Sequence, residues 1–136
     1  MTSLNQPVSS YAPQLLSHQT GLSVAVSTAN TFYNIGTAIS IPRNGIVKVS
    51  IIGYVSSANS DGFIGFSITR GSNTYSSNSG SPIATFSNGT SNFIILANND
   101  FAFEIAVLSG DSLQITASEN TAGITVYITD LVVVLQ

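Results

Sequence analysis

The sequence has no cysteine, and only 7% of its 136 residues are charged. The missing cysteine excludes disulfides, thiolate metal sites and thiol nucleophiles. Charged residues make up about a quarter of a typical globular protein, so this surface must take its polarity from serine, threonine and asparagine. Hydrophobic residues still reach 43%, which is the share expected of a folded domain and argues against a charge-rich disordered chain.

Positive charge is especially scarce. Arg43, Lys48 and Arg70 are the only Lys or Arg residues, and the formal net charge is −3. Nucleic-acid binding needs several phosphate contacts from Lys or Arg, so we expect no nucleic-acid partner. The same shortage argues against docking on anionic membranes.

Catalytic and metal-binding residue types are also few. His18 is the single histidine, and a triad would need it beside a nucleophile and an orienting carboxylate. A zinc site would need three or four ligands of the His, Cys or carboxylate type. Most of the six acids fall in turns, where they are typical hydrogen-bonding residues. We expect no enzyme activity and no resident cofactor; calcium, which accepts carboxylate and amide oxygens, is the one ion that "NND" at 98–100 leaves open.

The chain divides into two parts by pattern. Residues 1–20 contain Pro7 and Pro13 and have no regular period, so they predict an extended N-terminal arm. They also lack the cationic start and long apolar core of a standard secretion signal. Residues 21–136 consist of short β-type runs between turn signals and predict one domain.

The domain is predicted to be all-β. No segment keeps an apolar period of 3.6 residues, so no helix is expected. Asp61-Gly62 and Asn88-Gly89 are hairpin signals. Eight to ten short strands predict an antiparallel β-sandwich of jelly-roll topology. The predicted runs are 22–28, 32–41, 46–56, 63–71, 83–97, 101–108, 112–118 and 124–135.

Polar loops between these runs are candidate ligand-binding segments. Exposed aromatic rings beside amides can bind sugars, and Tyr75 and Asn73 offer that chemistry; Asp61 and Asn88 lie in other polar loops. The competing interpretation is that the tyrosine ends a strand, with its ring packed and its hydroxyl in water.

The final run "ITVYITDLVVVLQ", residues 124–136, is unusually apolar. A membrane-spanning helix needs roughly 20 apolar residues, so we expect no membrane insertion. As a strand, the segment "LVVVL" at 131–135 is apolar on both faces, which a strand covered on one side does not need. The simplest cover for the second face is another copy of the chain. The predicted interface residues are Tyr127, Leu131, Val133 and Leu135.

Two segments carry a resemblance to a known family. "IPRNGIVKVSIIGYVS" at 41–56 resembles the stretch of tumour-necrosis-factor-like and complement-head-like jelly rolls in which a Pro/Gly turn opens a central strand. "LSGDSLQITASENTAGITVYITDLVVVL" at 108–135 resembles their C-terminal portion, where a Gly-Asp turn, a variable loop and an apolar last strand follow one another.

This resemblance implies a homo-oligomer, and specifically a compact trimer around an apolar axis. Similar domains occur in cytokines, complement heads, lectins and virion surface proteins. We expect a non-enzymatic virion structural protein: a turret, spike, fibre knob or capsid decoration at the virion surface. Its partners would be other virion proteins and a host-surface glycan or receptor. The alternative is a small trimeric carbohydrate-binding lectin or adhesin that is extracellular or at the cell surface.

Overall fold

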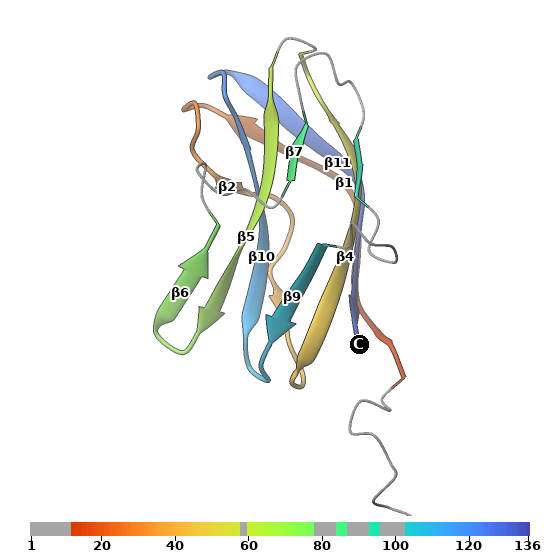
Figure 1. Cartoon of the computed structure of the whole chain (residues 1–136). Helices are drawn as coiled ribbons and strands as arrows, with labels where there is room; N and C mark the ends of the chain where they lie inside the picture. The colour runs from red at the N-terminus through yellow and green to blue at the C-terminus, as the bar shows by residue number, and fades with distance from the viewer. Residues whose placement is uncertain (1–11, 58–59, 78–83, 87–92, 96–102) are drawn as a thin grey trace, which may run out of the picture.

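Two antiparallel β-sheets pack face to face in the structure, a computed structural model that describes residues 12–57, 60–77, 84–86, 93–95 and 103–136 (Figure 1). The prediction of an all-β sandwich is confirmed. Within the described residues there is no helix long and apolar enough to cross a bilayer.

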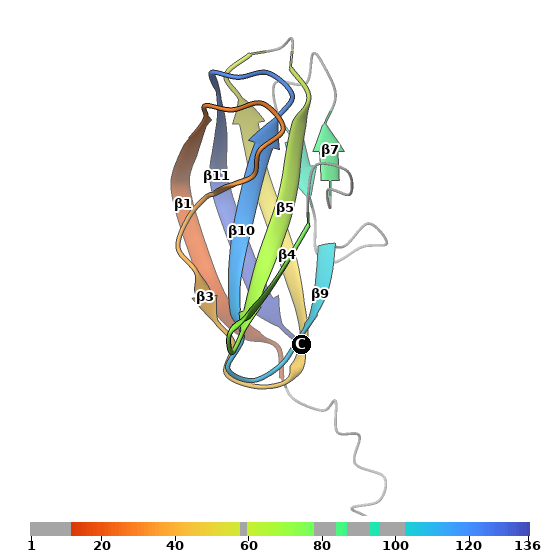
Figure 2. The ribbon, with the colours of Figure 1, turned by 90° about the vertical axis from the view of Figure 1, so that its left-hand side faces the viewer.

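The first sheet, called sheet A, has the strand order β1-β11-β4-β8, and β9 also pairs with β4. The second, called sheet B, has the order β2-β10-β5-β6; β3 pairs with β10 and β7 with β5. Figure 2 shows β10 and β5 in front of β11 and β4. The strands of sheet A are β1 (Gln14–Val26), β4 (Gly45–Val55), β8 (Phe93–Ile95), β9 (Phe103–Val107) and β11 (Ile124–Leu135). The strands of sheet B are β2 (Tyr33–Asn34), β3 (Ile39–Ser40), β5 (Gly62–Arg70), β6 (Asn73–Ser76), β7 (Ala84–Phe86) and β10 (Ser112–Glu119).

Most connections cross from one sheet to the other, as in a jelly roll. The link from β5 to β6 is a hairpin, which turns at Gly71 with a φ of 61°. Asp61-Gly62, expected to form a hairpin, instead joins β4 of sheet A to β5 of sheet B. Asn88-Gly89 lies outside the described residues, and the strands that flank it, β7 and β8, belong to different sheets.

The core between the sheets is built mainly from isoleucine and valine, whose branched side chains pack well on a pleated surface. β4 shows the alternation clearly, because Val47, Val49 and Ile51 are fully buried while the residues between them face outward. Leu113 and Ile115 of β10 are buried in the same core and belong to sheet B. A single continuous core therefore fills the space between the sheets.

The predicted boundary between an arm and a domain at residue 20 is wrong, because β1 begins at Gln14 and runs through it. β1 pairs with β11 from Gln14 opposite Leu135 to Val26 opposite Ile124. His18 therefore lies in a strand and not in an irregular arm. Two irregularities hide the strand pattern in the sequence: a register shift after Leu15 and a left-handed backbone at Gly21.

β11 contains a bulge that changes which residues face the core. The register with β4 shifts between Ile128 and Asp130, and the hydroxyl of the extra residue Thr129 donates a hydrogen bond to the carbonyl of Ile52. Val126 faces the core before the bulge. After it, Leu131, Val133 and Leu135 face the core and are fully buried within one copy of the chain. These three predicted interface residues are therefore core residues and cannot contact a second copy.

Candidate interaction surface

The outer face of sheet A, the side turned away from sheet B, carries an unusual amount of exposed apolar surface. Leu15 of β1 is 61% exposed, and Ile46, Ile52 and Tyr54 of β4 are 44%, 43% and 37% exposed. Isolated exposed apolar residues are ordinary, but a continuous apolar patch marks an interaction site. Ile46, Ile52 and Tyr54 alternate with buried residues of β4, so they share one face. Leu15 lies on the same face, because it pairs with Val134 and Val134 pairs with the outward-facing Lys48.

Neighbouring strands extend this patch. In the strand pairing, Val134 of β11 is opposite Leu15 of β1 on one side and opposite Lys48 of β4 on the other. Val132 is two residues earlier in β11 and lies on the same face. Tyr127, the one predicted interface residue that remains on this face, stacks on Tyr54 with ring centroids 4.6 Å apart and planes at 12°. The patch therefore runs across β1, β11 and β4.

The acidic side chains on this face lie beside basic residues. His18 Nε2 lies 3.0 Å from Asp130 Oδ1 between β1 and β11. Lys48 Nζ lies 3.8 Å from Glu104 Oε1 between β4 and β9. All four side chains are partly exposed, so neither pair contributes much stability.

Tyr75 and Asn73, two of the predicted ligand-binding residues, lie on β6. The ring of Tyr75 is 53% exposed, and the guanidinium of Arg70 lies 5.9 Å from its centroid. Asp61 lies at the other end of β5, next to Gly62, so it does not join them. Asn88 lies outside the described residues.

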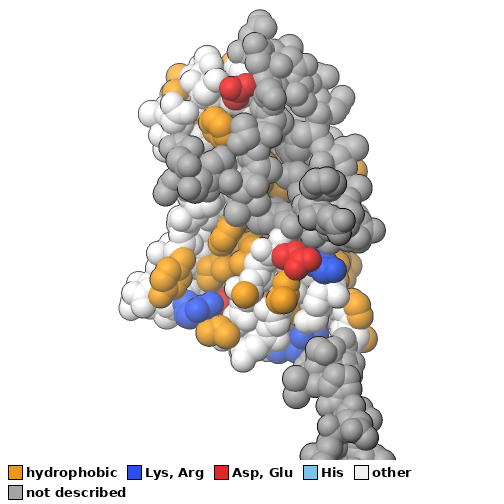
Figure 3. All heavy atoms as spheres, viewed as in Figure 1, with side chains coloured by type: hydrophobic (Ala, Val, Ile, Leu, Met, Phe, Trp, Pro, Cys, Tyr) orange, Lys and Arg blue, Asp and Glu red, His pale blue; other side chains and the backbone are white. Residues whose placement is uncertain are grey.

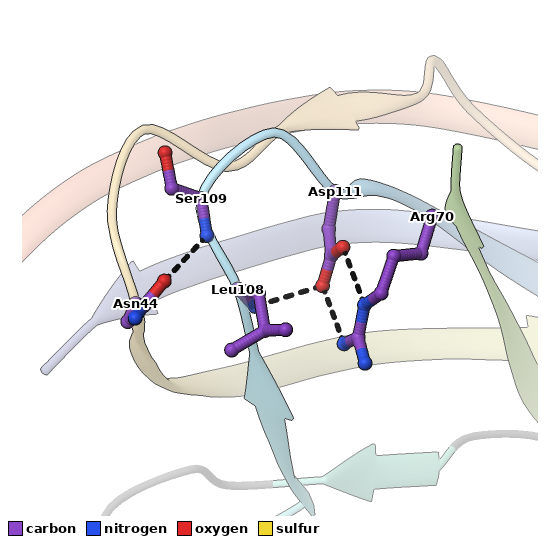
Figure 4. Close-up of polar contacts among 5 residues, drawn as sticks. All are labelled: Asn44, Arg70, Leu108, Ser109 and Asp111. Atoms are coloured by element: carbon purple, nitrogen blue, oxygen red, sulfur yellow. Dashed lines mark hydrogen bonds and ion pairs between the residues drawn. The ribbon is translucent and has the colours of Figure 1, made fainter.

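Arg70 is held by a buried carboxylate at the end of the sandwich where the β5–β6 and β9–β10 turns meet (Figure 4). Asp111 accepts hydrogen bonds from Arg70 Nε at 2.9 Å and Nη2 at 2.8 Å, and from the backbone amide of Leu108 at 2.8 Å. The Arg70 guanidinium keeps the pKa of Asp111 below its usual range. Asn44 Oδ1 accepts a hydrogen bond from the amide of Ser109 and ties the β3–β4 turn to the same place.

Figure 3 shows one side of the molecule, on which hydrophobic side chains gather in the lower half beside the few charged ones. Within the described residues no three His, Asp or Glu side chains come together as a metal cluster. The "NND" segment considered for calcium lies outside those residues.

The exposed apolar residues of β4 were not identified from the sequence as part of an interaction surface. Ile46 and Ile52 lie on the face of β4 that also holds Lys48 and Ser50, and the alternation does predict that face to be the outer one. The signal that could have identified the surface is the presence of large apolar residues there, where solvent-facing positions of a strand are usually polar.

No protein-family model matches the chain, and no curated protein sequence matches it. Among solved structures, it is similar to a carbohydrate-binding module (CBM6cm-2) from Cellvibrio mixtus lichenase 5A in complex with cellotriose. The match covers 88% of each chain with 14% sequence identity and a TM-score of 0.35. At this TM-score the similarity carries no argument about ligands.

Proposed function

We propose that the protein is a non-enzymatic structural head that assembles into a homo-oligomer, a trimer, through the outer face of sheet A. The observation that carries this proposal is the apolar patch of Leu15, Ile46, Ile52 and the Tyr54–Tyr127 stack on a face that sheet B does not cover. Left exposed, such a patch promotes unspecific association. Buried between copies, it supplies the free energy of assembly.

A second copy of the chain is the partner that this face fits. In a trimer the same face of three copies packs around one axis, so an excess of one charge on that face would cause repulsion. Here each acid has a base beside it, as in the pairs His18–Asp130 and Lys48–Glu104. Aromatic residues, such as the stacked Tyr54 and Tyr127, are also enriched at protein interfaces.

The resemblance to tumour-necrosis-factor-like and complement-head-like jelly rolls supports a trimer as the oligomer and a virion surface as its setting. We place the head on the surface of a virion, where a protein with few charges packs against neighbours of its own particle. A lectin has weaker support, because the described candidate ligand residues do not converge: Tyr75 and Asn73 lie at one end of β5 and Asp61 at the other.

Replacing Ile52 tests the proposed interface. Ile52→Asn removes an apolar side chain from the centre of the patch, and its 43% exposure means that the fold of one copy should tolerate the change. We expect the dissociation constant of the oligomer to rise about tenfold or more. Multi-angle light scattering over a dilution series would measure it.

The matched control is Tyr75→Asn. Tyr75 is 53% exposed but lies on β6, a strand of sheet B, and not on the outer face of sheet A. This variant should assemble as the wild type does. A wild-type protein that stays monomeric at micromolar concentration, or equal weakening by both substitutions, would contradict the proposed interface.

A further inference from the structure

Glu119 is a buried acid that has no partner among the described residues. It is the last residue of β10 and is 0% exposed. It follows Leu113, Ile115 and Ala117 in the alternation, so its side chain lies on the face that packs against sheet A. Within the part of the chain that the structure describes, neither of its carboxylate oxygens has a hydrogen-bond partner. Burying an unpaired carboxylate costs several kcal/mol, so a proton or a cation must neutralise this one.

The basic residues of the chain cannot do so. Lys48 lies beside Glu104, Arg70 lies beside Asp111, and His18 lies beside Asp130. Arg43 Nη1 donates to the carbonyl of Gln136, at the end of sheet A opposite to Glu119. These four are all the Lys, Arg and His residues that the chain has.

The nearest described charge is instead a second acid. Asp61 precedes Gly62, which is opposite Glu119 in the pairing of β5 with β10. Burial first, and then the negative charge of Asp61, raise the pKa of Glu119 to about 7. The described Lys, Arg and His side chains all lie elsewhere, so a carboxylate at Glu119 has no basic side chain beside it.

We propose that Glu119 and Asp61 bind one hard divalent cation, calcium, at the end of the sandwich where β4 leads to β5 and β10 leads to β11. Two carboxylates balance the charge of one such ion. The donors are oxygen atoms, and the chain has no cysteine and no second histidine for a softer metal. Calcium accepts both oxygens of a carboxylate in an irregular shell that water and carbonyl oxygens complete, whereas magnesium demands near-ideal octahedral geometry.

The backbone around the two acids is already fixed in place. The amide of Asp61 donates to Asn120 Oδ1, and the amide of Asn120 donates to the carbonyl of Asp61, each at 3.0 Å. The amide of Asn30 donates to the carbonyl of Glu119 at 2.7 Å. Three connections between the sheets therefore meet at this point, and a bound cation would lock them together.

Calcium titration of the full chain tests this proposal. After dialysis against a chelator at pH 7.5, we expect 10 mM CaCl₂ to raise Tm by about 5 °C. Isothermal titration calorimetry should give one site per chain with a Kd of about 10⁻⁴ to 10⁻³ M, the range of extracellular calcium modules. MgCl₂ at the same ionic strength should have a much smaller effect.

Three variants locate the site. Glu119→Gln should lose the calcium response and, in chelator, should be at least as stable as the wild type, because it removes an uncompensated buried charge. Asp61→Asn should raise the Kd about tenfold. Glu104→Gln, which changes an exposed acid on β9, should keep the full response. A wild type that does not respond to calcium, an equal response to magnesium, or a Glu119→Gln variant that still responds would overturn the proposal.

Discussion

Asp111 is the described acid whose surroundings favour its charged form most clearly. Its carboxylate is buried and accepts two hydrogen bonds from Arg70 and one from the amide of Leu108. Hydrogen bonds from a guanidinium and an amide stabilise the charged form, which is why the pKa of Asp111 is lowered. This side chain joins the two turns at one end of the sandwich.

The lowered pKa predicts how stability depends on pH. An unfolded aspartate titrates near 3.9, and the folded one titrates below that. The contribution of Asp111 is therefore fully present above about pH 5 and is lost as the pH falls through the folded pKa. Asp111→Asn should lower Tm by about 5 °C at pH 7, and the difference from the wild type should shrink below pH 4. Thermal melts from pH 7 to pH 2 would show this; a constant difference would contradict it.

The sequence predicts the partners and the burial of some single residues but not of others. The Gly-Asp turn at 110–111 is a recognisable turn signal, and the hydrogen bond from Leu108 to Asp111 is of that local kind. Arg70 could not be predicted as the partner, because it is 41 residues away and is brought there by the pairing of β5 with β10. The burial of Glu119 has no local signal either, since it depends on the far end of that same pairing.

At the scale of elements, alternation predicts the faces of a regular strand and fails at a bulge. β4 is regular, and its inner and outer faces follow directly from the sequence. β11 is not regular, because the extra residue Thr129 moves the following residues to the opposite face. The apolar character of 131–135 on both sides was predicted, but the assignment of Leu131 and Val133 to the interface was not correct, since they face the core.

Two substitutions in β11 separate its faces. Val133→Asp places a charge in the core, so we expect it to lower the free energy of unfolding by more than about 4 kcal/mol and to abolish folding. Val132→Asp changes the adjacent residue on the outer face of sheet A, so we expect a folded protein with weakened assembly. Circular dichroism and light scattering would measure the two effects. Unfolding of both variants as monomers would contradict the second half of this prediction.

At the scale of the whole molecule, the two ends of the sandwich hold different connections. Arg43 contacts both ends of the described chain, with Nη1 3.0 Å from the carbonyl of Gln136 and Nη2 3.5 Å from that of Ala12. The β5–β6 hairpin and the β9–β10 turn lie at this same end (Figure 1). The connections near Asp61 and Asn120 lie at the opposite end. The sequence predicted the polar loops but not their separation, because that depends on the order of strands in the sheets.

The difference between the two ends of the sandwich gives a test of the proposed virion setting. If the segment before Gln14 tethers the head to the particle, the end near Asn120 points outward and the β5–β6 hairpin points toward the particle. An epitope tag inserted between Thr121 and Ala122 should then bind antibody on intact particles, and a tag inserted at Ser72 should bind only on the isolated protein. Both sites are exposed, so both tags should be equally reactive before assembly. Immunogold labelling of purified particles would measure the difference. Equal labelling would reject this orientation, and absence of the chain from particles would reject the virion setting while leaving the interface on sheet A to its own test.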